Sequence, residues 1–242
     1  MNDTKLLELS VVVLCYKAED KVYDYVDKVV EALSGVGCSW NLILVGNYHN
    51  ECEDKTPEIV NNIASENKYI KAVTLQKEGM MGWDARSGLS LADGKYICLI
   101  DGDDQMPSED IARVYSKIKN SDLDLVQTYR VVRHDGVMRT IQSYFYNLIF
   151  KLMFPGSGVR DVNSKPKIFT KKVYDGMRLN SNDWFLDAEM IIHCARLKLK
   201  VAEIPTTFFK CKYRKSYVKF NAVFEFLLNL IMAKFSRRSQ DA

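Results

Sequence analysis

Three carboxylates and one amide follow a short apolar run in the middle of the chain. The run covers residues 96–100, and Asp101, Asp103, Asp104 and Gln105 come directly after it. Hard divalent cations prefer oxygen ligands, and magnesium typically keeps one or two carboxylates together with substrate phosphates. The cluster therefore fits a metal site, although a polar turn before the next helix would use the same residue types.

The chain around this cluster alternates between strand and helix patterns. Short apolar runs, typical of strands buried on both faces, cover residues 9–14, 41–45, 96–100 and 123–128, and residues 70–75 partly alternate between apolar and polar. Helical patterns cover residues 19–33, 56–66, 84–92 and 108–120. This alternation predicts a doubly wound α/β domain. Ligands of such sheets bind beyond the carboxyl ends of the strands, which is where the acidic cluster falls.

The second half of the chain carries three more helical patterns, at residues 141–154, 187–198 and 219–235. The last combines apolar residues at helical spacing with basic residues at both ends. Such a helix suits the headgroup region of a membrane, and a core helix or a dimer interface is the competing interpretation. No window approaches about 18 uninterrupted apolar residues, so no membrane-spanning helix is predicted.

Bulk composition excludes several classes of protein. The length of 242 residues suits one large domain or a domain with an appendage, and 47% hydrophobic residues argue against disorder. The formal net charge of +3 is too small to indicate a nucleic-acid partner. The six cysteines have no paired spacing and the N-terminus carries no secretory signal, so we expect reduced thiols in a cytoplasmic protein.

The residues flanking the acidic cluster resemble family 2 glycosyltransferases, which are nucleotide-sugar enzymes with the GT-A fold. The resemblance covers nearly the whole chain and begins with VVVLCYKAED at residues 11–20. It continues through GMMGWDARSGLSLADGKYICLIDGDDQ at residues 79–105, where the family pattern is held by Gly82, Arg86, Gly88, Ala92 and Gly94. It implies a GT-A-like, mostly parallel sheet flanked by helices, with amphipathic helices at the C-terminal end.

The form Asp101-Gly-Asp103-Asp-Gln105 resembles the polyprenyl-phosphate sugar transferases, the dolichyl-phosphate mannose synthase-like branch of the family. The resemblance implies that Asp101, Asp103 and Gln105 hold Mg²⁺ or Mn²⁺ against the diphosphate of a UDP- or GDP-sugar. The implied nucleotide-sugar site consists of Tyr16, Asn47, Gly82, Arg86, Asp101 and Asp103.

Two positions depart from the family pattern. Asn47 stands where relatives usually carry acidic residues that grip the nucleoside, and it could hydrogen-bond a base or a ribose without a charge. The identity of the base is therefore left open. Lys165 stands where relatives often carry glycine, so contacts with the substrate could differ there.

Later segments resemble the acceptor side of the same branch. They are residues 159–169, 183–189, 204–209 and 214–218. A hydroxyl acceptor would need a general base, for which Asp187 and Glu189 are candidates, although carboxylates at a helix start also complement the helix dipole. A phosphate acceptor would need cations instead, and the candidates are Arg130, Arg160, Lys212 and Arg214. Arg214 ranks first because it matches the arginine loop of the branch, and a solvated basic loop is the alternative.

The sequence thus predicts a metal-dependent inverting glycosyltransferase that moves a sugar from a nucleotide-diphosphate sugar to polyprenyl phosphate. Two alternatives stay open: a transferase with a sugar-hydroxyl acceptor in surface polysaccharide or glycan assembly, and a non-catalytic nucleotide-sugar-binding protein. We expect a catalytic domain at residues 1–212, with a nucleotide-sugar-binding half at 1–130 and an acceptor half at 131–212, followed by a basic loop and an amphipathic helix at 213–242. We also expect peripheral contact with the cytoplasmic face of a membrane, with a homodimer or a membrane partner as open options.

Overall fold

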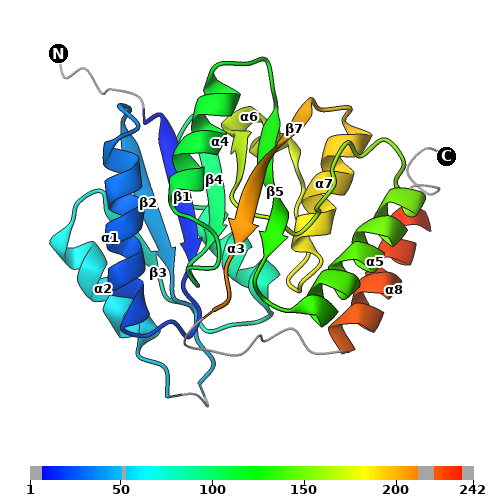
Figure 1. Ribbon diagram of the computed structural model, residues 1–242. Helices are drawn as coiled ribbons and strands as arrows, with labels where there is room; N and C mark the ends of the chain where they lie inside the picture. The colour runs from blue at the N-terminus through cyan, green and yellow to red at the C-terminus, as the bar shows by residue number, and fades with distance from the viewer. Residues whose placement is uncertain (1–6, 51–52, 212–220, 236–242) are drawn as a thin grey trace.

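Seven strands form one sheet in the computed structural model of the chain, which describes residues 7–50, 53–211 and 221–235 (Figure 1). The strands are β1 (Leu9–Leu14), β2 (Trp40–Val45), β3 (Ile70–Val73), β4 (Tyr96–Asp101), β5 (Leu125–Arg133), β6 (Lys167–Thr170) and β7 (Val201–Phe208). Their order is β3-β2-β1-β4-β6-β5-β7, and β6 runs antiparallel to β4 and β5 whereas the other pairs are parallel. Because β1, β2 and β4 are parallel neighbours, their carboxyl ends meet at one edge of the sheet.

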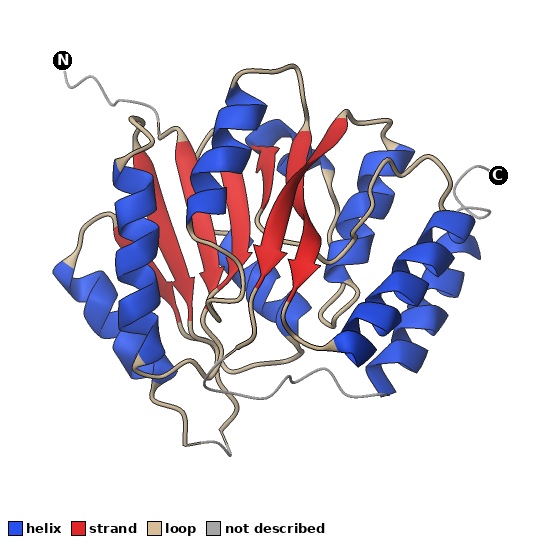
Figure 2. Cartoon of the chain, in the orientation of Figure 1, coloured by secondary structure: helices blue, strands red, loops and turns tan. Residues whose placement is uncertain are grey.

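Helices cover both faces of the sheet. One layer holds α1 (Lys21–Ser34), α2 (Thr56–Glu66) and α4 (Glu109–Lys119), and Figure 1 shows α1 and α4 in front of the strands. The other layer holds α3 (Met81–Leu89), α6 (Lys171–Gly176) and α7 (Leu186–Arg196). α5 (Val137–Met153) and α8 (Asn221–Phe235) pack against each other outside α7, at the edge of the molecule (Figure 2).

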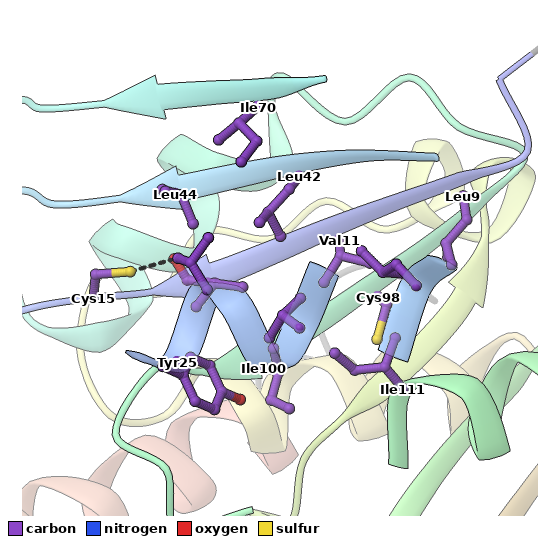
Figure 3. Packing of buried hydrophobic residues seen from close by; sticks show 14 of the residues in the cluster. Leu9, Val11, Cys15, Tyr25, Leu42, Leu44, Ile70, Cys98, Ile100 and Ile111 are labelled. Atoms are coloured by element: carbon purple, nitrogen blue, oxygen red, sulfur yellow. Dashed lines mark hydrogen bonds between the residues drawn. The ribbon is translucent and has the colours of Figure 1, made fainter. Parts of the chain in front are cut away.

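The central strands are buried on both faces, which explains their unbroken apolar sequences. Every residue of β1 is buried. Val11 and Val13 pack in the layer with α1, α2 and α4, while Val12 packs on the opposite side with α3 and α7. Figure 3 shows the first layer from close by, with Val11 of β1 and Ile111 of α4 in the same apolar cluster. A parallel sheet covered by helices needs this pattern because neither face of the strand meets water.

The predicted alternation of strands and helices is confirmed, with shifts at the ends of elements. β5 continues to Arg133 instead of ending at residue 128, and α3 begins at Met81 instead of residue 84. β6 and α6 were not predicted, because they span only 4 and 6 residues. The fully buried Lys167 also interrupts the apolar pattern of β6, and an unpaired lysine is almost never buried.

The predicted boundary between the two halves, at residue 130, lies inside β5. One sheet therefore carries residues of both halves. Among the described helices, none combines the length and the hydropathy needed to cross a bilayer.

Candidate active site

The acidic loop begins where two neighbouring strands end. Asp101 is the last residue of β4 and lies opposite Leu14, the last residue of β1. The backbone N–H of Gly102 donates to Leu14 O at 2.9 Å, and a Cβ at Gly102 would lie 2.9 Å from the same oxygen. Asp104 adopts φ +56°, and its carboxylate lies 2.6 Å from Lys28 Nζ. Glycine thus lets the loop turn tightly against β1, and Asp104 ties the turn to α1.

Gln105 braces this loop against the segment that follows β7. Its side-chain Nε2 donates to Phe209 O at 2.9 Å, and its backbone O accepts from Phe209 N at 2.8 Å. Asp103 Oδ1 accepts from the backbone N–H of Gln105 at 3.2 Å. Because Nε2 is committed to Phe209, the amide oxygen of Gln105 is the side-chain atom suited to bind a cation.

Tyr25 of α1 is a buried residue under the electrostatic influence of the loop (Figure 3). Its hydroxyl has no hydrogen-bond partner among the described residues. Burial raises the pKa of Tyr25 well above its usual value, and the charges of Asp103, Asp101 and Asp104 raise it further. Buried hydroxyls usually have a partner, so a water or a ligand atom near the loop would satisfy an otherwise costly group.

The oxygen atoms of the loop fit a hard divalent cation that shares its coordination with a ligand. Asp101, Asp103 and Gln105 offer two carboxylates and one amide oxygen. Within residues 7–50, 53–211 and 221–235, no three His, Cys, Asp or Glu side chains lie close enough to form a metal site by themselves. A cation here would need further oxygen ligands, which suits a metal that keeps substrate phosphates in its coordination sphere.

Lys165 connects the acidic loop with Asp187. Because β6 runs antiparallel to β4, with Lys167 paired to Leu99, the residues just before β6 reach the end of β4. Lys165 Nζ lies 3.2 Å from Asp101 Oδ2 and 2.9 Å from Asp187 Oδ2. Lys167 Nζ lies 3.3 Å from Asp187 Oδ1. Two carboxylates that the sequence predicts for different parts of the site are therefore joined by one ammonium group.

Lys165 and Asp187 both stay charged in this network. Burial alone would lower the pKa of Lys165, but Asp101 and Asp187 outweigh it and raise the pKa above its usual value. Burial would raise the pKa of Asp187, but Lys165 and Lys167 bring it below its usual value. A carboxylate whose pKa is lowered in this way is a weaker proton acceptor, so the present arrangement does not favour Asp187 as a general base.

Gly82, Arg86 and Glu189 hold residues 180–183 from two sides. Glu189 Oε1 accepts from the backbone N–H of Asn180 at 3.0 Å, and Arg86 Nη1 donates to Asn180 O at 3.1 Å. A Cβ at Gly82 would lie 2.5 Å from a backbone oxygen of the same segment, so glycine is needed for this close approach. The side chains of Arg86 and Glu189 thus position a loop in this structure.

Asn47 follows β2 and is fully buried, with 0% exposure. Its Nδ2 donates to Asp84 Oδ1 at 3.0 Å and to Ser87 Oγ at 2.9 Å. Its Oδ1 accepts from the backbone N–H of Leu75 at 2.8 Å. Both N–H donors are therefore used, and the predicted contact of Asn47 with a nucleoside would need this arrangement to open.

Lys77 and Asp84 form a buried ion pair that the sequence did not point to, and their side chains are 2% and 4% exposed. Lys77 Nζ also lies 4.2 Å from the centroid of the Tyr16 ring, which meets the His49 ring edge-on at 6.1 Å. Burial lowers the pKa of Lys77, and the charge of Asp84 opposes that shift. Tyr16, one of the predicted site residues, therefore lies against a charged pair in which Lys77 precedes the bend at residues 78–80 and Asp84 lies in the first turn of α3.

The predicted acceptor residues differ in their surroundings. Arg130 forms a bidentate ion pair with Asp161, in which Nε lies 2.7 Å from Oδ2 and Nη2 lies 2.6 Å from Oδ1. Arg160 is exposed, and its guanidinium lies 4.8 Å from the centroid of the Tyr129 ring. Lys212 and Arg214 lie outside the described residues.

The sequence of the chain is similar to those of two enzymes that are named for polyprenyl phosphates. The chain is 28% identical over 177 residues to dodecaprenyl-phosphate galacturonate synthase of Rhizobium johnstonii, covering 72% of this chain and 51% of that protein. It is 25% identical over 170 residues to undecaprenyl-phosphate 4-deoxy-4-formamido-L-arabinose transferase of Pectobacterium atrosepticum, covering 70% of this chain and 50% of that protein. The chain thus spans about half the length of these relatives.

Solved structures share the fold. Glucosyl-3-phosphoglycerate synthase of Mycobacterium tuberculosis, in complex with Mn²⁺, UDP and phosphoglyceric acid, superposes with a TM-score of 0.71 at 16% identity, covering 96% of this chain and 78% of that one. Mannosyl-3-phosphoglycerate synthase of Rubrobacter xylanophilus gives a TM-score of 0.70 at 14% identity, covering 97% of this chain and 75% of that one. The expected GT-A fold is confirmed by these neighbours. Because the model of glycosyl transferase family 2 matches residues 10–179, well over half of the chain, the protein belongs to that family.

Proposed function

We propose that this chain transfers a sugar, with inversion, from a nucleoside-diphosphate sugar to a polyprenyl phosphate, and that the reaction depends on a divalent metal. The observation that carries the proposal is the oxygen cluster of Asp101, Asp103 and Gln105, at the edge where β1 and β4 end. The names of the two relatives, a dodecaprenyl-phosphate galacturonate synthase and an undecaprenyl-phosphate 4-deoxy-4-formamido-L-arabinose transferase, support a polyprenyl phosphate as the acceptor. Mn²⁺ and UDP in the structural neighbour support the donor class and the metal.

The chemistry explains why such a cluster is needed. The bond between the sugar and the diphosphate breaks, and negative charge grows on the leaving diphosphate while the sugar becomes oxocarbenium-like. When bound, Mg²⁺ or Mn²⁺ would supply a Lewis acid that neutralises this charge. Asp101 and Asp103 would hold the cation, and the bond between Gln105 and Phe209 would keep the loop in place.

A phosphate acceptor agrees with the state of Asp187. A phosphate oxygen is already anionic and needs no general base, whereas a sugar hydroxyl does. Asp187 is 2% exposed and is paired with two ammonium groups, and the carboxylate of Glu189 accepts backbone hydrogen bonds from Asn180 and Ser181. Asp187 is thus neutralised by lysines and Glu189 is engaged with the backbone, an arrangement that favours the acceptor that needs no general base.

The outer surfaces of α5 and α8 support contact with a membrane. Leu152 of α5 is 71% exposed and Met232 of α8 is 60% exposed. Among the side chains of the two helices that the structure describes, the other exposed apolar residues are Val137, Met138, Ile141, Tyr144, Phe145, Leu148, Leu228, Ile231 and Phe235. Arg139, Lys151 and Lys234 lie on the same helices. Apolar residues beside basic ones suit the headgroup region of an anionic bilayer, where a polyprenyl phosphate resides.

Transfer of label tests the proposed reaction. Purified protein is incubated with radiolabelled UDP- or GDP-sugars, a polyprenyl phosphate and Mn²⁺, and we expect label in the chloroform-soluble fraction. Asp103→Asn should lower the rate by about 100-fold or more, because transition-state charge loses its compensation. Asp104→Asn is the matched control, because the carboxylate of Asp104, next to Asp103 in sequence, pairs with Lys28 in the turn. A water-soluble product would support the hydroxyl-acceptor alternative, and no turnover with any donor would support a binding protein.

Vesicle flotation tests the membrane surface. Vesicles of phosphatidylglycerol should retain the wild type, and the double variant Leu152→Glu, Met232→Glu should bind several-fold less. Leu91→Glu alters an apolar residue that is 44% exposed elsewhere on the molecule and should bind as the wild type does. Equal binding of all three proteins would contradict the proposed membrane face.

A further inference from the structure

The ammonium group of Lys165 contacts the first aspartate of the acidic loop. Its Nζ lies 3.2 Å from Asp101 Oδ2, and the Lys165 side chain is 4% exposed whereas that of Asp101 is 34% exposed. The contact therefore joins a fixed, buried cation to a carboxylate that is open to solvent on its other side. The ammonium group of Lys165 therefore already compensates part of the negative charge of Asp101.

The surroundings of Lys165 fix it in this position. Its carbonyl oxygen accepts from Thr128 Oγ1 at 2.6 Å, and the backbone N–H of Thr128 donates to Pro166 O at 3.2 Å. On its far side, Nζ lies 2.9 Å from Asp187 Oδ2. The side chain is therefore held between two carboxylates by a backbone that is itself tied to β5.

Asp187 has a second cation of its own. Lys167 Nζ lies 3.3 Å from Asp187 Oδ1 and donates to Val162 O at 2.8 Å and to Ser164 O at 2.6 Å. Lys167 lies within ion-pair distance of Asp187 and not of Asp101. The two buried lysines thus share one carboxylate, and Lys165 is the one that also reaches the loop.

We propose that Lys165 is a resident counter-ion of Asp101 that makes the divalent cation and the nucleoside diphosphate bind together. This inference rests on the proposed metal role of Asp101 and Asp103. Without nucleotide, a divalent cation at Asp101 meets the positive charge of Lys165 at close range and binds weakly. A bound diphosphate adds negative charge that both cations can share, so each partner raises the affinity of the other.

The coupling between binding of Mn²⁺ and binding of the nucleotide can be tested on the wild type, without any variant. Binding of Mn²⁺ to the full chain is followed by the loss of the electron paramagnetic resonance signal of free Mn²⁺, which requires no turnover. We expect UDP or GDP to tighten Mn²⁺ binding by about tenfold or more. Mn²⁺ binding of equal strength with and without either nucleotide would overturn the inference, whatever the variants do.

Substitution of the lysine tests its role directly. Lys165→Met should tighten Mn²⁺ binding about tenfold in the absence of nucleotide, and the gap between variant and wild type should narrow when UDP or GDP is present. Lys167→Met is the matched control, because it removes an equally buried ammonium group that contacts Asp187, and its Mn²⁺ affinity should stay close to that of the wild type. Thermal melting checks that both variants are folded.

The outcomes separate the inference from the proposed function. If Lys165→Met binds Mn²⁺ no more tightly than the wild type while Asp103→Asn abolishes binding, the inference is wrong and the metal site stands. If Lys167→Met tightens binding as much as Lys165→Met, a general effect of charge replaces the specific contact with Asp101, and the inference is wrong. If Asp103→Asn binds Mn²⁺ as the wild type does, the proposed metal site fails and the inference fails with it.

Discussion

Arg130 with Asp161, and Lys165 with Asp101 and Asp187, form two ion-pair networks that share charge in different ways. The first joins one guanidinium to one carboxylate in two-pronged geometry, with side chains that are 10% and 9% exposed. The second divides one ammonium group between two carboxylates, and Asp101 is 34% exposed. In the Arg130–Asp161 pair, called the closed pair below, each charge is neutralised by its partner and none is left to bind a ligand. In the Lys165 network, called the open network below, the partly exposed carboxylate of Asp101 can exchange Lys165 for another partner. The comparison separates charges that hold the fold from charges that can respond to a substrate.

Removing one charge from the closed pair should give the largest effect on stability. Arg130→Met leaves the carboxylate of Asp161 buried without its partner and should lower the free energy of unfolding by about 3–5 kcal/mol. Urea unfolding measures the change. Arg139→Met is the control, because its contact with Asp135 is long, at 3.7 Å, and its side chain is 36% exposed, so the loss should stay at about 1 kcal/mol or less. Equal losses in the two variants would erase the distinction.

The closed pair should also respond to acid. Burial would raise the pKa of Asp161, but the charge and the hydrogen bonds of Arg130 lower it to about 2. Since the pKa is depressed in the folded state, the stabilisation is present above about pH 4, the ordinary aspartate value, and is lost as the pH falls through about 2. Urea midpoints between pH 5 and pH 2 should record a loss of about 2–3 kcal/mol from this group. Asp161→Asn should be less stable overall but flatter over this range, and an equally steep fall in that variant would rule out Asp161 as the source.

The smallest of the expected effects is the change in the rate of sugar transfer when Asp187 of the open network is substituted. A phosphate acceptor needs no general base, so Asp187→Asn should lower the rate by about tenfold or less, well short of the loss in Asp103→Asn. A loss of about 100-fold to 10,000-fold, the range typical of a missing general base, would favour the hydroxyl acceptor instead. The comparison of the two variants therefore distinguishes the two acceptor classes.

The strands and helices at the edge of the sheet where β1 and β4 end could be predicted from the sequence, because each of them buries apolar residues at a regular spacing. The run LSVVVL of β1 is buried on both faces, and α4 buries Ile111, Val114 and Ile118 along one side. Spacing alone indicates such elements. The position of Asp101 at the end of β4 follows from the same pattern, which is why the acidic loop could be found before the fold.

The partners of the polar residues could not be predicted in this way. Asn47 reads as a candidate ligand, but its hydrogen bonds go to Asp84 and Ser87, which lie 37 and 40 residues further along the chain. Lys165 reads as a departure from a family pattern, but its meaning depends on Asp101, which lies 64 residues away in sequence. Such contacts arise from the packing of α3 against the sheet and from the antiparallel pairing of β6 with β4, and no local periodicity records them.

The region around Tyr16, which the sequence predicts to bind the nucleotide sugar, was equally hard to predict in detail. Lys77 pairs with Asp84 and lies over the ring of Tyr16, although nothing in the sequence indicated this ion pair. Which base the proposed nucleotide-sugar site accepts therefore has to be measured.

The most direct test of the account is thermal unfolding of the full chain with UDP, GDP or neither, each with Mn²⁺ or with EDTA. Ligands that bind the folded state raise the melting temperature by mass action. We expect a clear rise in melting temperature with one nucleotide in the presence of Mn²⁺, a much smaller rise with EDTA, and loss of the Mn²⁺-dependent part in Asp103→Asn. A rise that is the same with EDTA, or that survives in Asp103→Asn, would contradict the claim that the acidic loop binds the nucleoside diphosphate through a metal.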